Sequence, residues 1–82
     1  MENFDLDLAR CQVKERAGGA LADYIVYFRN NNIDRITDAD NPFVIAYREL
    51  YQIENRYAGK CETKEDVQKL LDRIVELRAK VK

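Results

Sequence analysis

The sequence contains no histidine, no serine and no tryptophan. Histidine is the most frequent general base in enzymes, and serine is a common hydroxyl nucleophile. Cys11 and Cys61 have no imidazole to activate them, and no pair of carboxylates is placed together on an apolar surface. The composition therefore predicts a protein that is not an enzyme, with no catalytic residue and no cofactor.

Cysteine is scarce as well, because only Cys11 and Cys61 are present, far apart in the chain. A structural zinc site needs about four ligands in close pairs, and disulfide-stabilised domains carry more cysteines. The acidic segment 30–41 lacks the spacing of a calcium loop, since Arg35 stands where glycine is needed and Asn41 where the closing glutamate is needed. We expect no metal site and two free thiols at the same end of the fold, and whether they are ever bridged stays open.

Long hydrophobic runs are also missing, since no apolar stretch approaches the roughly 18 residues of a membrane span. Segment 1–5 is acidic, whereas a signal peptide begins with basic residues. These observations predict a cytoplasmic protein without a membrane partner. The 14 basic and 15 acidic residues give a net charge of −1, so there is no dominant positive field and we do not expect a nucleic-acid partner.

The residues that are present suit a small helical fold. Hydrophobic residues make up 46% and charged residues 35% of the chain, as in folded, highly helical domains. Residues 1–82 are few enough to form a single helical domain. The strongest loop signals, segments 30–41 and 58–62, divide this domain into three helical segments.

The first predicted helix spans about residues 5–31. Gly18 and Gly19 stand in its middle, and each costs a helix about 1 kcal/mol relative to alanine. The apolar face keeps its phase across the pair, which favours one continuous helix, with a kink or break as the alternative. We interpret the glycines as a place where a neighbouring helix approaches closely. The apolar face of this helix comprises Leu6, Ala9, Val13, Ala17, Ala20, Tyr24, Tyr27 and Phe28.

The second predicted helix begins after an N-cap at Asp40 or Asn41, with Pro42 in its first turn, and ends near Gly59 as C-cap. The third begins after Thr63 as N-cap and runs to the end of the chain. The core face of the second comprises Phe43, Ala46, Tyr47, Leu50, Ile53 and Tyr57. The apolar residues of the third are Val67, Leu70, Leu71, Ile74, Val75, Leu77 and Val81.

Three amphipathic segments with short connections predict an all-α fold, an antiparallel up-down-up three-helix bundle with a long first helix. The first helix would be about 40 Å long and the other two about 25 to 28 Å. Its first two turns, which carry Leu6, Leu8 and Ala9, should therefore project beyond the bundle unless the helix bends.

Several apolar and tyrosine side chains are candidates for contact with a partner. Ala22 and Val26 point away from the predicted bundle axis, as does Ile45, and Val26 and Ile45 should lie at the same level on neighbouring helices. Tyrosine offers large contact area at low entropic cost. The candidate partner or oligomer interface comprises Leu8, Ala22, Val26, Tyr27, Ile45 and Tyr51.

Three charged residues, Arg10, Glu54 and Arg78, intrude on the apolar faces, and Arg10 and Glu54 form a candidate polar groove. Glu54 falls in the middle of the core face of the second helix. We interpret it as a core acid held by an arginine or a tyrosine hydroxyl of the same chain. The alternative is a polar spot in a groove that receives a donor from a partner.

Taken together, these features predict a small protein–protein interaction module that acts stoichiometrically through an outer helical face and forms a homo-oligomer. One alternative is a regulator or inhibitor of the size that phages and mobile elements encode against host or defence enzymes. Another is a nucleic-acid-binding bundle, because the third helix ends in basic residues. The sequence does not predict the identity of the protein partner.

Overall fold

The computed structural model describes residues 4–82 and contains three α-helices, α1 (Leu6–Asn30), α2 (Pro42–Gln52) and α3 (Lys64–Ala79). Two short helical turns, the π-helix η1 (Ile53–Tyr57) and the 3₁₀-helix η2 (Ala58–Lys60), continue α2 without a break. The described residues contain no strand, so the predicted all-α fold with three helices is confirmed.

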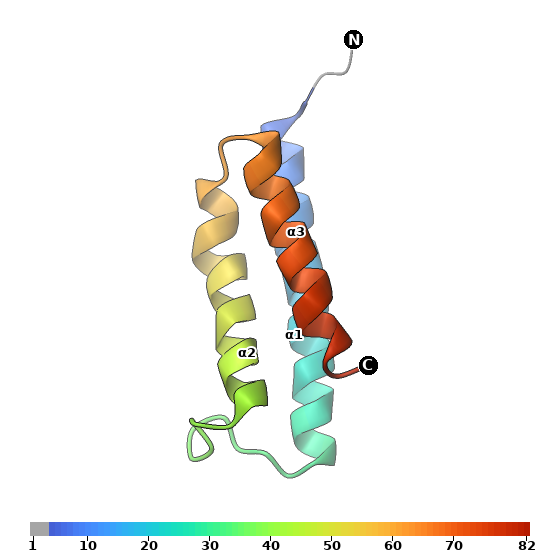
Figure 1. Cartoon of the computed structure of the whole chain (residues 1–82), viewed down its shortest axis with the longest axis vertical. Helices are drawn as coiled ribbons and strands as arrows, with labels where there is room; N and C mark the ends of the chain where they lie inside the picture. The colour runs from blue at the N-terminus through green and yellow to red at the C-terminus, as the bar shows by residue number, and fades with distance from the viewer. Residues whose placement is uncertain (1–3) are drawn as a thin grey trace.

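Consecutive helices run in opposite directions, and α1 extends along the whole molecule (Figure 1). At one end, the rings of Tyr27 in α1 and Phe43 in α2 lie 4.6 Å apart between centroids. At the other end, the Nε of Arg10 donates to the carbonyl oxygen of Cys61 at 2.8 Å. The start of α2 therefore lies beside the end of α1, and the connection to α3 lies beside the start of α1.

Each α-helix begins at a residue whose side chain accepts a backbone N–H. Asp5 accepts from Leu8 at 3.0 Å, and Asn41 accepts from Phe43 at 2.8 Å. Pro42 occupies the first turn of α2, where its missing N–H leaves no hydrogen bond unmade. At α3, Thr63 and Asp66 form a reciprocal capping box. The N-caps predicted for the second and third helices are confirmed.

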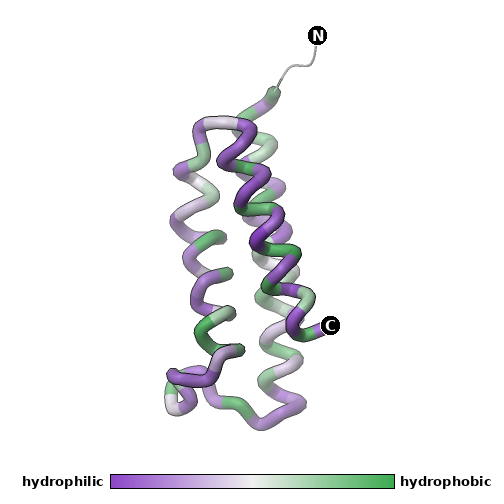
Figure 2. The backbone as a smooth tube through the Cα atoms, in the orientation of Figure 1, coloured by the Kyte–Doolittle hydropathy of each residue, from purple (hydrophilic) through white to green (hydrophobic). Residues whose placement is uncertain are grey.

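The core lies along the axis of the bundle and contains no buried charged residue in the described part of the chain. Apolar and polar residues alternate along each helix, so no helix is apolar on all sides (Figure 2). Tyr24 is the largest fully buried side chain, and its hydroxyl donates to the carbonyl oxygen of Leu77 at 2.6 Å. Burial raises the pKa of Tyr24 and keeps this donor protonated. The buried core comprises Ala9, Val13, Ala17, Ala20, Leu21, Tyr24, Phe28, Val44, Ala46, Leu50, Ile53, Ala58, Cys61, Val67, Ile74 and Leu77.

The π-helix changes which residues of the second helical segment face the core. The N–H of Ala58 donates to the carbonyl oxygen of Ile53, five residues earlier, so this turn holds one more residue than an α-helical turn. Ile53 and Ala58 are both buried as a result, and the side chain of Tyr57 is 43% exposed. The prediction that Tyr57 belongs to the core is therefore wrong.

The expectation that Gly59 is the C-cap of the second helix is wrong. Gly59 lies within η2 and is not a left-handed C-cap, because no described glycine has a positive φ. The segment ends instead in a 3₁₀ turn, which satisfies its last carbonyl groups by tighter bonds. Val75, one of the apolar residues of the third helix, is 63% exposed, since the helical rotation of α3 carries it past the edge of the core.

The glycine pair lies inside a continuous helix, as predicted, but no helix backbone approaches it. A Cβ atom on Gly18 would lie 2.8 Å from Oε2 of Glu54, and one on Gly19 would lie 3.2 Å from Nη1 of Arg78. The glycines therefore make room for two long side chains, one from η1 and one from α3. The interpretation as a close helix–helix contact is wrong.

The start of α1 does not project beyond the bundle. Ala9 is buried, and Arg10 is held by the carbonyl oxygen of Cys61 in the connection to α3. At its other end, α1 extends past the end of α3 (Figure 1). The connection near Cys61 covers the side of these turns that carries Ala9, whereas Leu8 stays 56% exposed, so the expectation that the first two turns lack cover is wrong for Ala9 only.

Candidate interaction surface

The outer side of α1 exposes apolar side chains. Leu8 is 56% exposed and Val26 is 54% exposed, and Ala22 is exposed between them. These three predicted interface residues lie roughly half a helical turn away from the buried Val13 and Tyr24. They therefore form one row on the side of α1 that faces away from the core.

Val26 and Ile45 do not form the predicted cross-helix patch. Val26 lines a shallow hollow of about 220 Å³ with Val81 and Lys82, so it borders the end of α3. Glu54 lies on the side of its helical segment that contacts α1. Ile45 stands nine residues earlier, which places it on the opposite side of the segment, away from α1. Both residues are exposed, but they lie on different sides of the bundle.

The two tyrosines of the predicted interface differ in their surroundings. Tyr27 is half-buried, and its ring packs against Phe43 and, edge-on, against Phe28 at 6.5 Å between centroids. Its ring therefore closes the end of the core. Tyr51 is exposed and stands one turn before Glu54, on the flank of α2 that borders α1.

The predicted polar groove of Arg10 and Glu54 is not formed, because Arg10 lies near the start of α1 whereas Glu54 lies beside the middle of that helix. Arg10 is held at the start of α1 by the carbonyl oxygen of Cys61. Glu54 is half-buried beside Gly18, in the middle of the helix. Within residues 4–82, Glu54 makes no hydrogen bond or ion pair, so the expected arginine or tyrosine partner from the same chain is absent.

Two opposite charges thus flank the glycine pair. The carboxylate of Glu54 lies over Gly18, and the terminal nitrogens of Arg78 lie over Gly19. The Nε of Arg78 donates to Asp23 at 2.6 Å, which fixes the guanidinium across α1. The sequence shows both charges as intruders on apolar faces, but their placement on the glycines depends on the π-turn and on the position of α3.

A bidentate ion pair joins α2 to α3. Arg73 donates to both carboxylate oxygens of Glu49, at 2.5 Å and 2.8 Å. The adjacent guanidinium lowers the pKa of Glu49, and the hydrogen-bonded carboxylate raises the pKa of Arg73. Arg73 also donates to Glu76 at 3.2 Å. This cluster fixes the two helices relative to each other.

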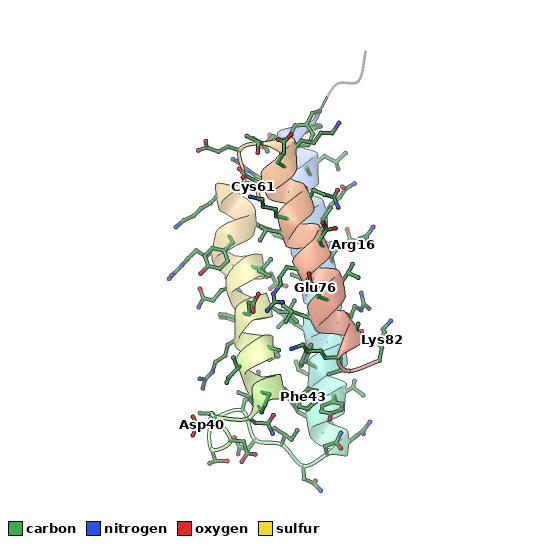
Figure 3. All side chains as sticks on the ribbon, viewed as in Figure 1. Arg16, Asp40, Phe43, Cys61, Glu76 and Lys82 are labelled. Atoms are coloured by element: carbon green, nitrogen blue, oxygen red, sulfur yellow. The ribbon has the colours of Figure 1, made fainter. Side chains whose placement is uncertain are left out.

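The two thiols are unbridged, and the acidic 31–41 connection contains a turn held by its own side chains. Cys61 is buried where α3 begins (Figure 3), burial raises its pKa, and Cys11 is exposed and unbridged. In the 31–41 connection, the side chain of Asp34 accepts the N–H of Ile36 at 2.7 Å and so forms a turn. No group of three metal-ligating side chains occurs in the part of the chain that the structure describes. The described helices also include none that is long and apolar enough to cross a membrane.

No family model, curated protein or solved structure matches this chain.

Proposed function

We propose that this protein is a non-enzymatic interaction module, which binds protein partners stoichiometrically through the outer side of α1 and self-associates. The row of Leu8, Ala22 and Val26 on that side is the observation that carries the proposal. Covering apolar surface is favourable by about 25 cal/mol per Å², so such a row gains free energy when a second surface covers it.

The size of the domain supports self-association. A chain of 82 residues buries a smaller fraction of its surface on folding than a larger domain does. Apolar contacts between copies therefore add a substantial share to a small intrachain core. The two unbridged thiols support the cytoplasm as the site of action, because oxidising compartments favour disulfides.

Sedimentation velocity over a micromolar to near-millimolar range tests the proposal. We expect the average mass to rise above the 9.6 kDa of one chain as the concentration increases. A mass that stays at one chain throughout this range would contradict self-association.

A matched pair of variants tests the surface. Val26 and Ile45 are both 54% exposed, but they lie on different helices and different sides of the bundle. Val26→Asp should shift the equilibrium toward monomer, because it places a charge in the row on α1. Ile45→Asp should leave association unchanged, and circular dichroism should show equal helicity in both variants. Equal association by the two variants would exclude the outer side of α1 as the contact surface.

A further inference from the structure

The exposed side of α1 has the periodicity of a coiled-coil seam. Seven residues of α1, together with Phe4 just before the helix begins, recur at alternating intervals of four and three, which is the average spacing of 3.5 at which two helices keep facing each other. All are exposed except Gly18, which is half-buried under Glu54. The seam comprises Phe4, Leu8, Cys11, Glu15, Gly18, Ala22, Ile25 and Arg29.

We propose that a second copy of this chain packs its α1 antiparallel against this seam. The inference rests on the proposed function and names its partner and geometry. One antiparallel register places every seam residue opposite another seam residue. In this register Leu8 faces Ile25 of the second copy, Cys11 faces Ala22, Glu15 faces Gly18, and Phe4 faces Arg29.

The seam is self-complementary in size in this register. Leu8 and Ile25 form an apolar pair near each end, and Cys11 and Ala22 are both small.

The two charges over the glycine pair select the antiparallel orientation. Lys14 stands one turn before Gly18, on the flank of α1 that faces η1, and Glu15 stands one turn before Gly19, on the flank that faces α3. In an antiparallel helix pair related by a two-fold axis, the flank of α1 that faces η1 lies beside the same flank of the second copy, and the two flanks that face α3 likewise lie side by side. The second copy's Lys14 therefore approaches Glu54, and its Glu15 approaches Arg78.

This pairing supplies the donor that Glu54 lacks in the single chain. Glu54 has no hydrogen bond or ion pair among residues 4–82, and only Nε of Arg78 is used by Asp23. In a parallel pair, the Lys14 residues of the two copies would lie at the same level along α1. Each would face the side of the other copy that carries Arg78, so it would not reach Glu54. The charges of this surface thus complement those of a second copy in one orientation.

The exposed native thiol of Cys11 allows a direct test of the register. In the proposed dimer the two Cys11 residues are about 16 Å apart along the seam, too far for a disulfide. Ala22→Cys places a second thiol opposite Cys11, so mild oxidation with diamide, which accepts the two hydrogens, should yield a covalent dimer. Ile45→Cys carries the same number of thiols and should not cross-link faster than the wild-type protein.

Two cross-linking results would overturn the proposal. Rapid cross-linking of the wild-type protein through Cys11 would indicate a parallel pair. Ala22→Cys that cross-links no faster than Ile45→Cys, while sedimentation still shows a dimer, would refute this register and leave the proposed function intact. A chain that remains monomeric throughout would contradict both.

Charge exchange tests the electrostatic part of the proposal. Lys14→Glu and Glu54→Lys should each weaken dimerisation roughly tenfold, the change expected for about 1.4 kcal/mol. The double variant should recover most of this loss, because the pair is restored with its signs exchanged. Lys69→Glu on the exposed side of α3 is the control and should have no effect. If the double variant loses as much dimer affinity as the two single variants combined, the two residues do not contact each other.

Discussion

Replacing Gly18 by alanine tests the observation that side chains, and not a helix backbone, occupy the space beside the glycine pair. Alanine gains about 1 kcal/mol over glycine inside a helix. The new methyl group would lie 2.8 Å from Oε2 of Glu54, so the carboxylate must move aside. That movement breaks no hydrogen bond among the described residues, because Glu54 makes none there. We therefore expect Gly18→Ala to stabilise the free chain.

The expected size of the effect follows from these two contributions. A net gain of roughly 0.5 to 1 kcal/mol corresponds to a rise in Tm of about 2 to 8 °C for a domain of this length. Gly19→Ala should gain less, since its methyl group would lie 3.2 Å from Nη1 of Arg78, which is held by Asp23. Thermal melts by circular dichroism at low micromolar concentration measure both variants.

Glu54→Ala provides the control for Gly18→Ala. With Glu54 truncated, the methyl group meets no neighbour, so the gain from Gly18→Ala should reach its full value in the Glu54→Ala background. A Gly18→Ala variant that melts below the wild type, and that Glu54→Ala does not rescue, would refute the reasoning. Such a result would mean that the helix backbones themselves are crowded at this level.

Three further predictions concern the contacts that hold the helices together. Because Arg73 lowers the pKa of Glu49, the stability that this pair contributes is present above the unfolded pKa of 4.5 and is lost as pH falls through the lower folded pKa. Glu49→Gln should therefore reduce the loss of stability between about pH 5 and 2 in a series of urea denaturations. An unchanged loss of stability in this variant would contradict the assignment. Tyr24→Phe should destabilise the fold by about 1 kcal/mol in urea titrations, because a buried donor to the carbonyl oxygen of Leu77 is lost, and equal midpoints would show that this bond contributes nothing. Thr63→Ala should cost about 0.5 to 2 kcal/mol through loss of the capping box of α3, whereas Thr63→Ser should retain most of that stability in the same titration.

The sequence predicts the helices well because their signals are local. Asn41 with Pro42, and Thr63 with Asp66, specify helix starts by hydrogen bonds within a few residues. The phase of the apolar residues on both sides of the glycine pair likewise predicts a continuous α1. These features require no knowledge of the tertiary fold.

The features that were missed depend on contacts between segments distant in the chain. The π-turn that exposes Tyr57 adds one residue to a helical turn, and an apolar period of 3.6 residues carries no sign of it. The burial of Ala9 depends on the connection near Cys61, which the sequence places only approximately. The charges of Glu54 and Arg78 are visible in the sequence, but their meeting at Gly18 and Gly19 follows only from the packed bundle.

An NMR dilution series on the ¹⁵N-labelled protein tests the central proposal, that copies of this chain associate through the outer side of α1. We predict concentration-dependent amide shifts at Leu8, Ala22 and Val26, with no comparable change around Ile45 or on the exposed side of α3. Shifts that are absent at every concentration, or that gather around Ile45 and α3, would contradict it.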